Sequence, residues 1–233
     1  MDDLPEARSF ATTRWSLILA AGSGGDAALA VLCRNYWHPL YAFARRLGHT
    51  PHDAEDLTQG FLADLLRRSG LSAVVPGAGR FRTFLLASLK NFIADQRDRA
   101  KALKRGGGSI PVSLDGTGES FLDRIPDNCA APEATFDRGW AIAVVERALE
   151  RVKAQYVRQP ELFDALRPML TGDAENHAGT AASLGLSAGT IKVALHRLRR
   201  RYGAALRAEV AETVSDPAEV EAELRHLLTV LGG

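Results

Sequence analysis

The segment from Ala178 to Tyr202 constrains the fold more than any other part of the sequence. It reads Ala-Gly-Thr-Ala-Ala-Ser-Leu-Gly-Leu-Ser-Ala-Gly-Thr-Ile-Lys-Val-Ala-Leu-His-Arg-Leu-Arg-Arg-Arg-Tyr. A short helix of small residues is predicted to end at Leu184, because Gly185 can adopt the left-handed backbone conformation that stops a helix. Leu186 is expected to fill the turn, and Ser187 to cap the next helix. This order predicts a helix-turn-helix.

The second helix of this pair has an apolar face and a basic face. The apolar residues recur at helical spacing and are Ile191, Leu195, Leu198 and Tyr202. The basic face is predicted to enter the major groove of DNA, with early residues at base edges and the later arginines at phosphates. The residues predicted to bind DNA here are Ser187, Thr190, Lys192, His196, Arg197, Arg199, Arg200 and Arg201. The alternative is an ordinary surface helix with a solvated arginine face.

Proline and glycine residues cluster in the middle of the chain. Between Gly106 and Pro132 they interrupt a stretch with little periodicity, which is typical of a flexible linker. Elsewhere apolar residues recur at helical spacing, and no alternating run is long enough to predict a strand. The sequence therefore predicts an all-α protein of two small helical domains, the second containing the helix-turn-helix. The expected parts are residues 1–105, a linker at 106–132, residues 133–206 and a C-terminal helical extension at 207–233.

The first domain is predicted to contain three helices. One covers about residues 26–47. The next opens at Thr50, with Pro51 at its first position and Asp53 three residues after the cap, a variant of the capping box. The third begins near Arg80 and carries a basic face beside an apolar one. In the second domain a helix is expected around Phe136 and a shorter one at about 161–170.

Charge is segregated along the chain, although the formal net charge is only +1. Eight basic residues and two acids lie between Arg80 and Arg105, and no acid lies between His177 and Ala208. The balancing acids are concentrated at residues 53–64 and 209–223. This distribution predicts two basic surfaces for phosphate and acidic surfaces for a different partner.

Other features bear on location and chemistry. No apolar run approaches the roughly 20 residues that span a bilayer, and the acidic N-terminus lacks the apolar segment of a secretory signal. Cys33 and Cys129 are the two cysteines, without the spacing of a zinc knuckle or a disulfide framework. The chain is therefore expected to be cytoplasmic, with no cofactor and no metal. No nucleophile–base pair or phosphate loop stands out, so no enzymatic activity is expected.

With these residues in place, the chain resembles the extracytoplasmic-function sigma factors, a group of the sigma-70 family, over about residues 10–206. Asp53-Ala-Glu-Asp-Leu-Thr-Gln-Gly-Phe61 is similar to the family signature that docks on the clamp helices of RNA polymerase. Phe81-Arg-Thr-Phe-Leu-Leu-Ala-Ser-Leu-Lys-Asn-Phe-Ile-Ala-Asp95 is similar to the family helix that faces the −10 element and helps to open it. Gly185-Leu-Ser-Ala-Gly-Thr-Ile-Lys-Val193 is similar to the start of the segment that reads the −35 element.

The resemblance implies a sigma factor that directs promoter recognition and transcription initiation without catalysis of its own. Its implied partners are core RNA polymerase, double-stranded promoter DNA and the opened non-template strand. An anti-sigma protein or a protein kinase is a further candidate partner, and no membrane association is expected. The implied docking residues are Asp53, Glu55, Asp56, Gln59 and Phe61. The implied residues for the −10 element are Arg80, Arg82, Lys90, Asn91, Arg97, Arg99 and Lys101.

Alternative interpretations of these residues stay open. The aromatic residues Phe81, Phe84 and Phe92 are predicted to be core rather than stacking platforms for bases. The acids that follow Thr50 complement the helix dipole whether or not they dock. A metal site is an alternative interpretation of His49, His52, Asp53 and Asp56. The whole chain could instead be a stand-alone helix-turn-helix regulator, although such a regulator needs neither the acidic helix nor the helix after Arg80.

Two departures from the family pattern lead to hypotheses about regulation. Gly60 stands where the family usually has glutamate, so one docking charge is missing, and phosphorylation of the nearby Thr58 would restore it. Beyond Leu206 the chain continues, and Asp216 followed by Pro217 predicts one more helix. The apolar stripe of that helix is Val220, Leu224, Leu227, Leu228 and Leu231. The stripe is expected to pack on the second domain or on another protein, with the acids Glu219, Glu221 and Glu223 screening the basic helix.

Overall fold

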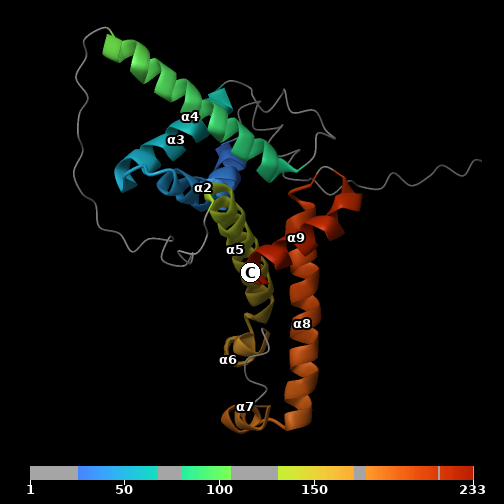
Figure 1. The fold of residues 1–233 in the computed structure, drawn as a ribbon. Coiled ribbons are helices and arrows are strands. Elements are labelled where there is room, and N and C mark those ends of the chain that lie inside the picture. The colour runs from blue at the N-terminus through green and yellow to red at the C-terminus, as the bar shows by residue number, and fades with distance from the viewer. Residues whose placement is uncertain (1–25, 68–79, 106–130, 171–176, 215, 233) are drawn as a thin grey trace, which may run out of the picture. The chain divides into compact units, whose positions relative to one another are not determined.

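The computed structural model describes residues 26–67, 80–105, 131–170, 177–214 and 216–232 (Figure 1). The described residues form helices, turns and one isolated antiparallel bridge between Arg80 and Val214. The predicted all-α fold is therefore confirmed. None of the described helices is both long enough and apolar enough to cross a membrane.

The first three described helices begin close to their predicted starts, and the first of them also ends close to its predicted end. They are α2 (Asp26–Arg46), α3 (Pro51–Arg67) and α4 (Phe81–Arg105). At the start of α3 the hydroxyl of Thr50 accepts the backbone N–H of Asp53 at 3.2 Å and donates to its carboxylate at 2.7 Å. The Asp53 carboxylate thus accepts a hydrogen bond from the capping hydroxyl and not from a backbone N–H, unlike in a capping box. The backbone N–H of Asp53, in the first turn, is still satisfied by the Thr50 hydroxyl.

The later helices also follow the predicted order. They are α5 (Pro132–Lys153), α6 (Pro160–Leu166), α7 (His177–Leu184), α8 (Ala188–Ala211) and α9 (Val220–Gly232). Between them lie the 3₁₀ turns η2 (Ala154–Tyr156), η3 (Arg167–Leu170) and η4 (Pro217–Glu219). The change from α6 to η3 occurs beside Pro168, which has no N–H for a helical hydrogen bond. Asp216 caps η4, accepting the N–H of Ala218 at 2.8 Å.

The turn between α7 and α8 has the predicted stop and cap but not the predicted apolar plug. Gly185 has a φ of 64°, the left-handed conformation that ends α7. Ser187 Oγ accepts the backbone N–H of Thr190 at 3.1 Å and so caps α8. Leu186, expected to fill the turn, is 41% exposed. Its backbone N–H donates to the carbonyl of Ala181 at 2.9 Å, so backbone hydrogen bonds rather than a buried side chain close the turn.

The chain divides into two compact units whose bounds differ from the predicted domains. The first unit contains the chain up to Ala141 together with residues 211–233, and the second contains Ile142–Val210. The start of α5 and the C-terminal extension thus belong with α2, α3 and α4. Most of the predicted linker, residues 106–130, lies outside the described residues, whereas Pro132 already begins α5. A boundary inferred from glycine and proline content cannot show which later segments return to the first unit.

Each unit has its own buried core. In the first unit the largest fully buried side chains include Tyr36, Phe43, Phe81, Phe136 and Trp140. The ring centroids of Tyr36 and Phe81 lie 5.2 Å apart in an edge-to-face pair, so α2 and α4 pack through aromatic contacts. Phe81 is thus core as predicted, while Phe84 and Phe92 are only partly buried.

The second core joins α5, α6, α7 and α8. Its buried residues are Ala148, Val152, Tyr156, Phe163, Leu166, Met169, Ala181, Ile191, Leu195, Leu198 and Ala205. The predicted apolar face of α8 therefore points into this core, and Tyr202 packs against it as a partly buried residue. The opposite face of α8 is left at the surface.

Candidate polymerase and nucleic-acid interfaces

The acidic face of α3 is exposed, as docking on a partner requires. Asp53, Glu55, Asp56 and Gln59 are all exposed along the first two to three turns. Asp56 also lies 3.2 Å from the Nδ1 atom of His52, on the same helix face. These carboxylates lie near the positive end of the helix dipole, which attracts negative charge, and their side chains are at the surface.

Phe61, by contrast, is a core residue and not a docking residue. Its side chain is buried, and its ring lies 5.7 Å from the ring of Phe92 on α4. The prediction that Phe61 contacts polymerase is therefore wrong for this fold. The large apolar side chain stabilises the packing of α3 on α4 instead.

Thr58 is also inaccessible, which contradicts the phosphorylation hypothesis. Its side chain is 0% exposed, and its hydroxyl donates to the carbonyl of Ala54 at 2.7 Å. A kinase needs the hydroxyl at the surface, and a phosphate needs water or cationic partners. Because α3 is amphipathic, the position next to the exposed Gln59 faces the core.

Part of the predicted basic face of α4 is exposed. Lys90, Asn91, Arg97 and Arg99 are at the surface, whereas the side chain of Lys101 lies outside the described residues. Lys90 donates to a carboxylate oxygen of Glu133 at 2.6 Å, and this hydrogen bond lowers the pKa of Glu133. Both partners are about half exposed, so the pair contributes little to stability and can open to another anion.

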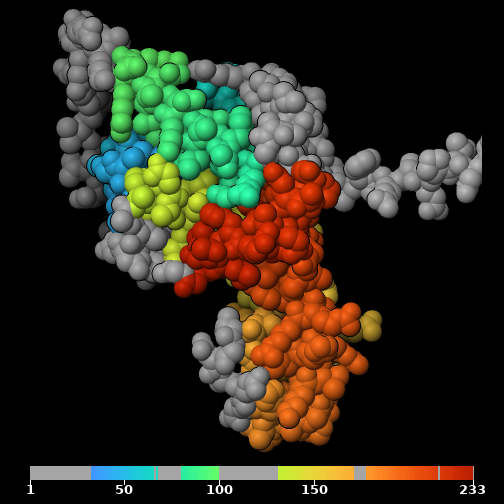
Figure 2. All heavy atoms as spheres, turned by 45° about the vertical axis from the view of Figure 1, so that its right-hand side comes forward, coloured from blue at the N-terminus to red at the C-terminus, as the bar shows by residue number. Residues whose placement is uncertain are grey.

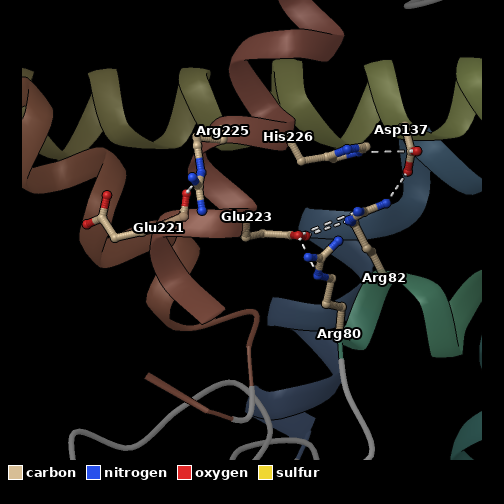
Figure 3. A network of polar contacts seen from close by, with 7 residues as sticks. All are labelled: Arg80, Arg82, Asp137, Glu221, Glu223, Arg225 and His226. Atoms are coloured by element: carbon tan, nitrogen blue, oxygen red, sulfur yellow. Dashed lines mark hydrogen bonds and ion pairs between the residues drawn. The ribbon is translucent and has the colours of Figure 1, made fainter. Parts of the chain in front are cut away.

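Arg82 is buried, which corrects its assignment to DNA. Its Nε donates to Glu223 at 2.5 Å and its Nη1 to Asp137 at 2.5 Å (Figure 3). The guanidinium also lies 5.1 Å from the ring centroid of Trp140. Burial by itself lowers the pKa of Arg82, but the hydrogen bonds and charges of the two carboxylates raise it overall. The side chain is therefore a fully paired cation inside the first unit.

Arg80 belongs to the same network. Its Nε lies 3.0 Å from the second carboxylate oxygen of Glu223, so one carboxylate joins two arginines at the start of α4. Figure 3 shows Glu223 pointing between the two guanidiniums, with His226 reaching Asp137 from the same helix. The Nε2 atom of His226 lies 3.3 Å from that carboxylate.

The C-terminal helix therefore packs within the first unit, which corrects both earlier hypotheses for it. Glu223 is 0% exposed, and Arg138 donates to the carbonyl of Val230 at 3.1 Å. Val220 and Leu227 are buried, while Leu228 of the predicted stripe is exposed. Figure 2 shows α9 lying against the first turns of α4 and α5. Glu223 thus neutralises arginines of α4 and does not screen α8.

The outer face of α8 keeps most of its predicted DNA-binding residues at the surface. Thr190, Lys192, His196, Arg197 and Arg200 are exposed. The other three predicted residues are also exposed, but each makes an internal contact. Ser187 caps the helix, Arg199 donates to the carbonyl of Met169 at 2.9 Å, and Arg201 lies 5.2 Å from the ring centroid of Tyr156.

One exposed residue of this face was absent from the prediction. Val193 is 52% exposed and lies one helical repeat before Arg197 and two before Arg200. The spacing of three, four and seven residues puts Val193, His196, Arg197 and Arg200 on one side of the helix. That spacing is visible in the sequence, but Val193 was assigned neither to the apolar face nor to the DNA-binding face.

A pocket of about 210 Å³ opens between α3 and α4 in the first unit. It is lined by Phe61, Asp64, Leu65, Phe84, Ser88, Asn91, Phe92 and Asp95. Its lining therefore combines aromatic rings with the exposed amide of Asn91. Among the residues that the structure describes, no group of three or more histidine, cysteine, aspartate or glutamate side chains could hold a metal ion.

Comparison with protein families places part of the chain in a known family model. Residues 32–102, which include α3 and most of α2 and α4, match the family model of sigma-70 region 2. Searches of curated proteins and of solved structures gave no match to the chain. The region 2 match covers less than half of the chain, and it supports a sigma factor role in promoter recognition with core RNA polymerase and promoter DNA. The chain therefore contains a sigma-70 region 2 domain at residues 32–102.

Proposed function

We propose that the chain is a sigma factor of the extracytoplasmic-function group that directs RNA polymerase to promoters. The observation that carries this proposal is the region 2 match, within which one helix exposes acids and the next exposes bases. Two neighbouring helices of opposite charge suit two different partners, a protein surface and nucleic acid. The proposal includes no catalytic step, and a protein with this role would act in the cytoplasm.

The docking part of the proposal rests on α3. Asp53, Glu55, Asp56 and Gln59 form its exposed acidic face and would contact the clamp helices of polymerase. Exposed carboxylates of this kind speed association and select the partner more than they add affinity. Phe61 and Thr58 take no part, because both are buried.

The DNA-opening part rests on α4 and the pocket beside it. Lys90, Arg97 and Arg99 would neutralise phosphates of the opened non-template strand, which loses its paired strand when the −10 element melts. An unpaired base needs a pocket bordered by rings and by a hydrogen-bonding group. The pocket between α3 and α4 has such a border in Phe84, Phe92 and Asn91.

The −35 part rests on α7 and α8, on the far side of the predicted linker at 106–132. A capped helix with an exposed polar start and exposed arginines suits the major groove. The alternative, a stand-alone regulator that binds DNA through α8 alone, would leave the acidic face of α3 without a role.

Binding to core RNA polymerase is the experiment that tests the proposal. The full chain is expected to form a complex with core polymerase on gel filtration, and the complex should start transcription at defined sites in a library of genomic fragments. Reversing two exposed charges, Glu55→Lys with Asp56→Lys, should weaken the complex by about tenfold or more, because like charges would then oppose each other. The matched control is Glu161→Lys with Asp164→Lys, which reverses two exposed acids on α6. DNA binding without any polymerase complex would favour the stand-alone regulator.

Promoter opening should depend on Asn91. Asn91→Ala removes an exposed amide that borders the pocket, so opening is expected to slow by about tenfold while polymerase binding stays unchanged. Permanganate reactivity of thymines in the −10 region measures the opening. Gln96→Ala removes an exposed amide from the same helix, outside the pocket, and should have no effect. Equal rates for the two variants would contradict a role for the pocket.

A further inference from the structure

We infer that Val193 is a specificity-determining residue that contacts the 5-methyl group of a thymine in the DNA bound by α8. The inference rests on the proposed function, because it requires that α8 enters a major groove. It adds a direct apolar base contact to a face for which hydrogen bonds and phosphate contacts were predicted.

The position of Val193 on α8 is the first observation. The core-facing residues Ile191, Leu195 and Leu198 are buried on the other side of the helix. Val193 is 52% exposed and lies among the exposed His196, Arg197 and Arg200. An isopropyl group therefore occupies the middle of a basic surface, one turn after the capped start of the helix.

The size of the side chains on this surface is the second observation. Gly189 lies four residues before Val193 on the same side, and apart from Ser187 Oγ at 3.7 Å nothing lies within 4 Å of where its Cβ would be. Gly189 has no side chain and Val193, one turn later, has a short one, so side chains project little from the middle of this face. Longer side chains, Lys192 and Arg197, border these two residues. Small side chains at the centre of the face let the helix backbone approach base edges, while the long cationic side chains reach phosphates.

The chemistry of the DNA major groove then identifies the group that Val193 contacts. The positive side chains around Val193 favour a polyanion, so the partner is nucleic acid rather than an apolar protein surface. Of the four bases, thymine alone presents an apolar group on its major-groove edge, the 5-methyl group. Burying that methyl against Val193 removes apolar surface of both partners from water.

The test uses the full chain and duplex DNA that it selects from a random-sequence library. Each thymine of the selected duplex is replaced in turn by deoxyuridine, which lacks the methyl group and keeps the hydrogen-bonding groups. At one position the replacement is expected to lower the affinity of the wild-type chain about fourfold, the factor for one buried methyl group. Val193→Ala should lower affinity for the thymine duplex by at least this factor and should show no further loss with deoxyuridine.

The matched control is Val157→Ala, the same substitution at a residue that is 78% exposed in the same unit but outside α8. It should bind both duplexes as the wild type does. Because both valines are exposed, neither variant should lose the fold, and circular dichroism checks this. An equal loss for Val193→Ala on both duplexes, or no thymine sensitive to methyl removal, would overturn the inference while leaving DNA binding by α8 intact. If no duplex is selected at all, the −35 part of the proposed function fails as well.

Discussion

Replacing Glu223 with glutamine is expected to lower the free energy of unfolding of the first unit by about 3 kcal/mol. The carboxylate is 0% exposed and joins Arg80 and Arg82 (Figure 3). Glutamine keeps the size of the side chain but removes its charge, so a buried guanidinium loses one of its two anionic partners. Asp137 still pairs with Arg82, which keeps the expected loss at the lower end of the range for a broken buried ion pair.

Glu221→Gln is the matched control for this prediction. It removes the same charge two residues away on α9, where the carboxylate is exposed and points away from the two arginines (Figure 3). Its effect on stability should stay within about 0.5 kcal/mol. Urea denaturation followed by near-ultraviolet circular dichroism measures both variants. Equal stabilities would show that Glu223 does not hold α9 in the first unit.

Thr58→Glu should have a comparable or larger effect, a loss of about 3–5 kcal/mol in the free energy of unfolding. Thr58 is fully buried, and its hydroxyl is bonded to the Ala54 carbonyl within α3. A glutamate there must either bury an unpaired charge or stay protonated with a raised pKa, and both states cost stability. Its greater length also overfills the buried position that Thr58 occupies.

Gln59→Glu separates this effect from a general effect of added negative charge. Residue 59 is the next residue of α3 and is exposed, so the same new carboxylate should change stability by no more than about 0.5 kcal/mol. Thermal unfolding of the two variants measures the difference. A Thr58→Glu variant that is as stable as Gln59→Glu, and that binds core polymerase more tightly than the wild type, would restore phosphorylation of Thr58 as a regulatory mechanism.

The local structure of the chain follows from short stretches of sequence. The caps at Thr50, Ser187 and Asp216 and the left-handed Gly185 depend on residues within about one turn, so helix starts and stops were predictable. Helical spacing also predicted which side of α8 packs in the core. The same spacing puts Val193 on the outer side of α8, although it was not among the predicted DNA-binding residues.

Accessibility of single residues was harder to predict, because it depends on which neighbouring element covers a helix face. Phe61 and Thr58 lie in a stretch that resembles a docking signature, yet α3 turns both toward the first core. Leu186 was expected to be buried because it is apolar, but backbone hydrogen bonds alone close its turn. In each case the sequence pattern correctly predicted the helix or turn but not what packs against it.

The sequence by itself determined the helices, their caps, the segregation of charge and the region 2 domain, because these depend on neighbouring residues or on residue order. Only the tertiary structure decided the role of the C-terminal extension and of the arginines at the start of α4. Arg82 and Glu223 are 141 positions apart, and no spacing rule connects residues at that distance. Read along the chain, Arg82 is one more cation in a basic run. In the fold, burial makes its pairing with Glu223 and Asp137 necessary, since an unpaired charge away from water is costly.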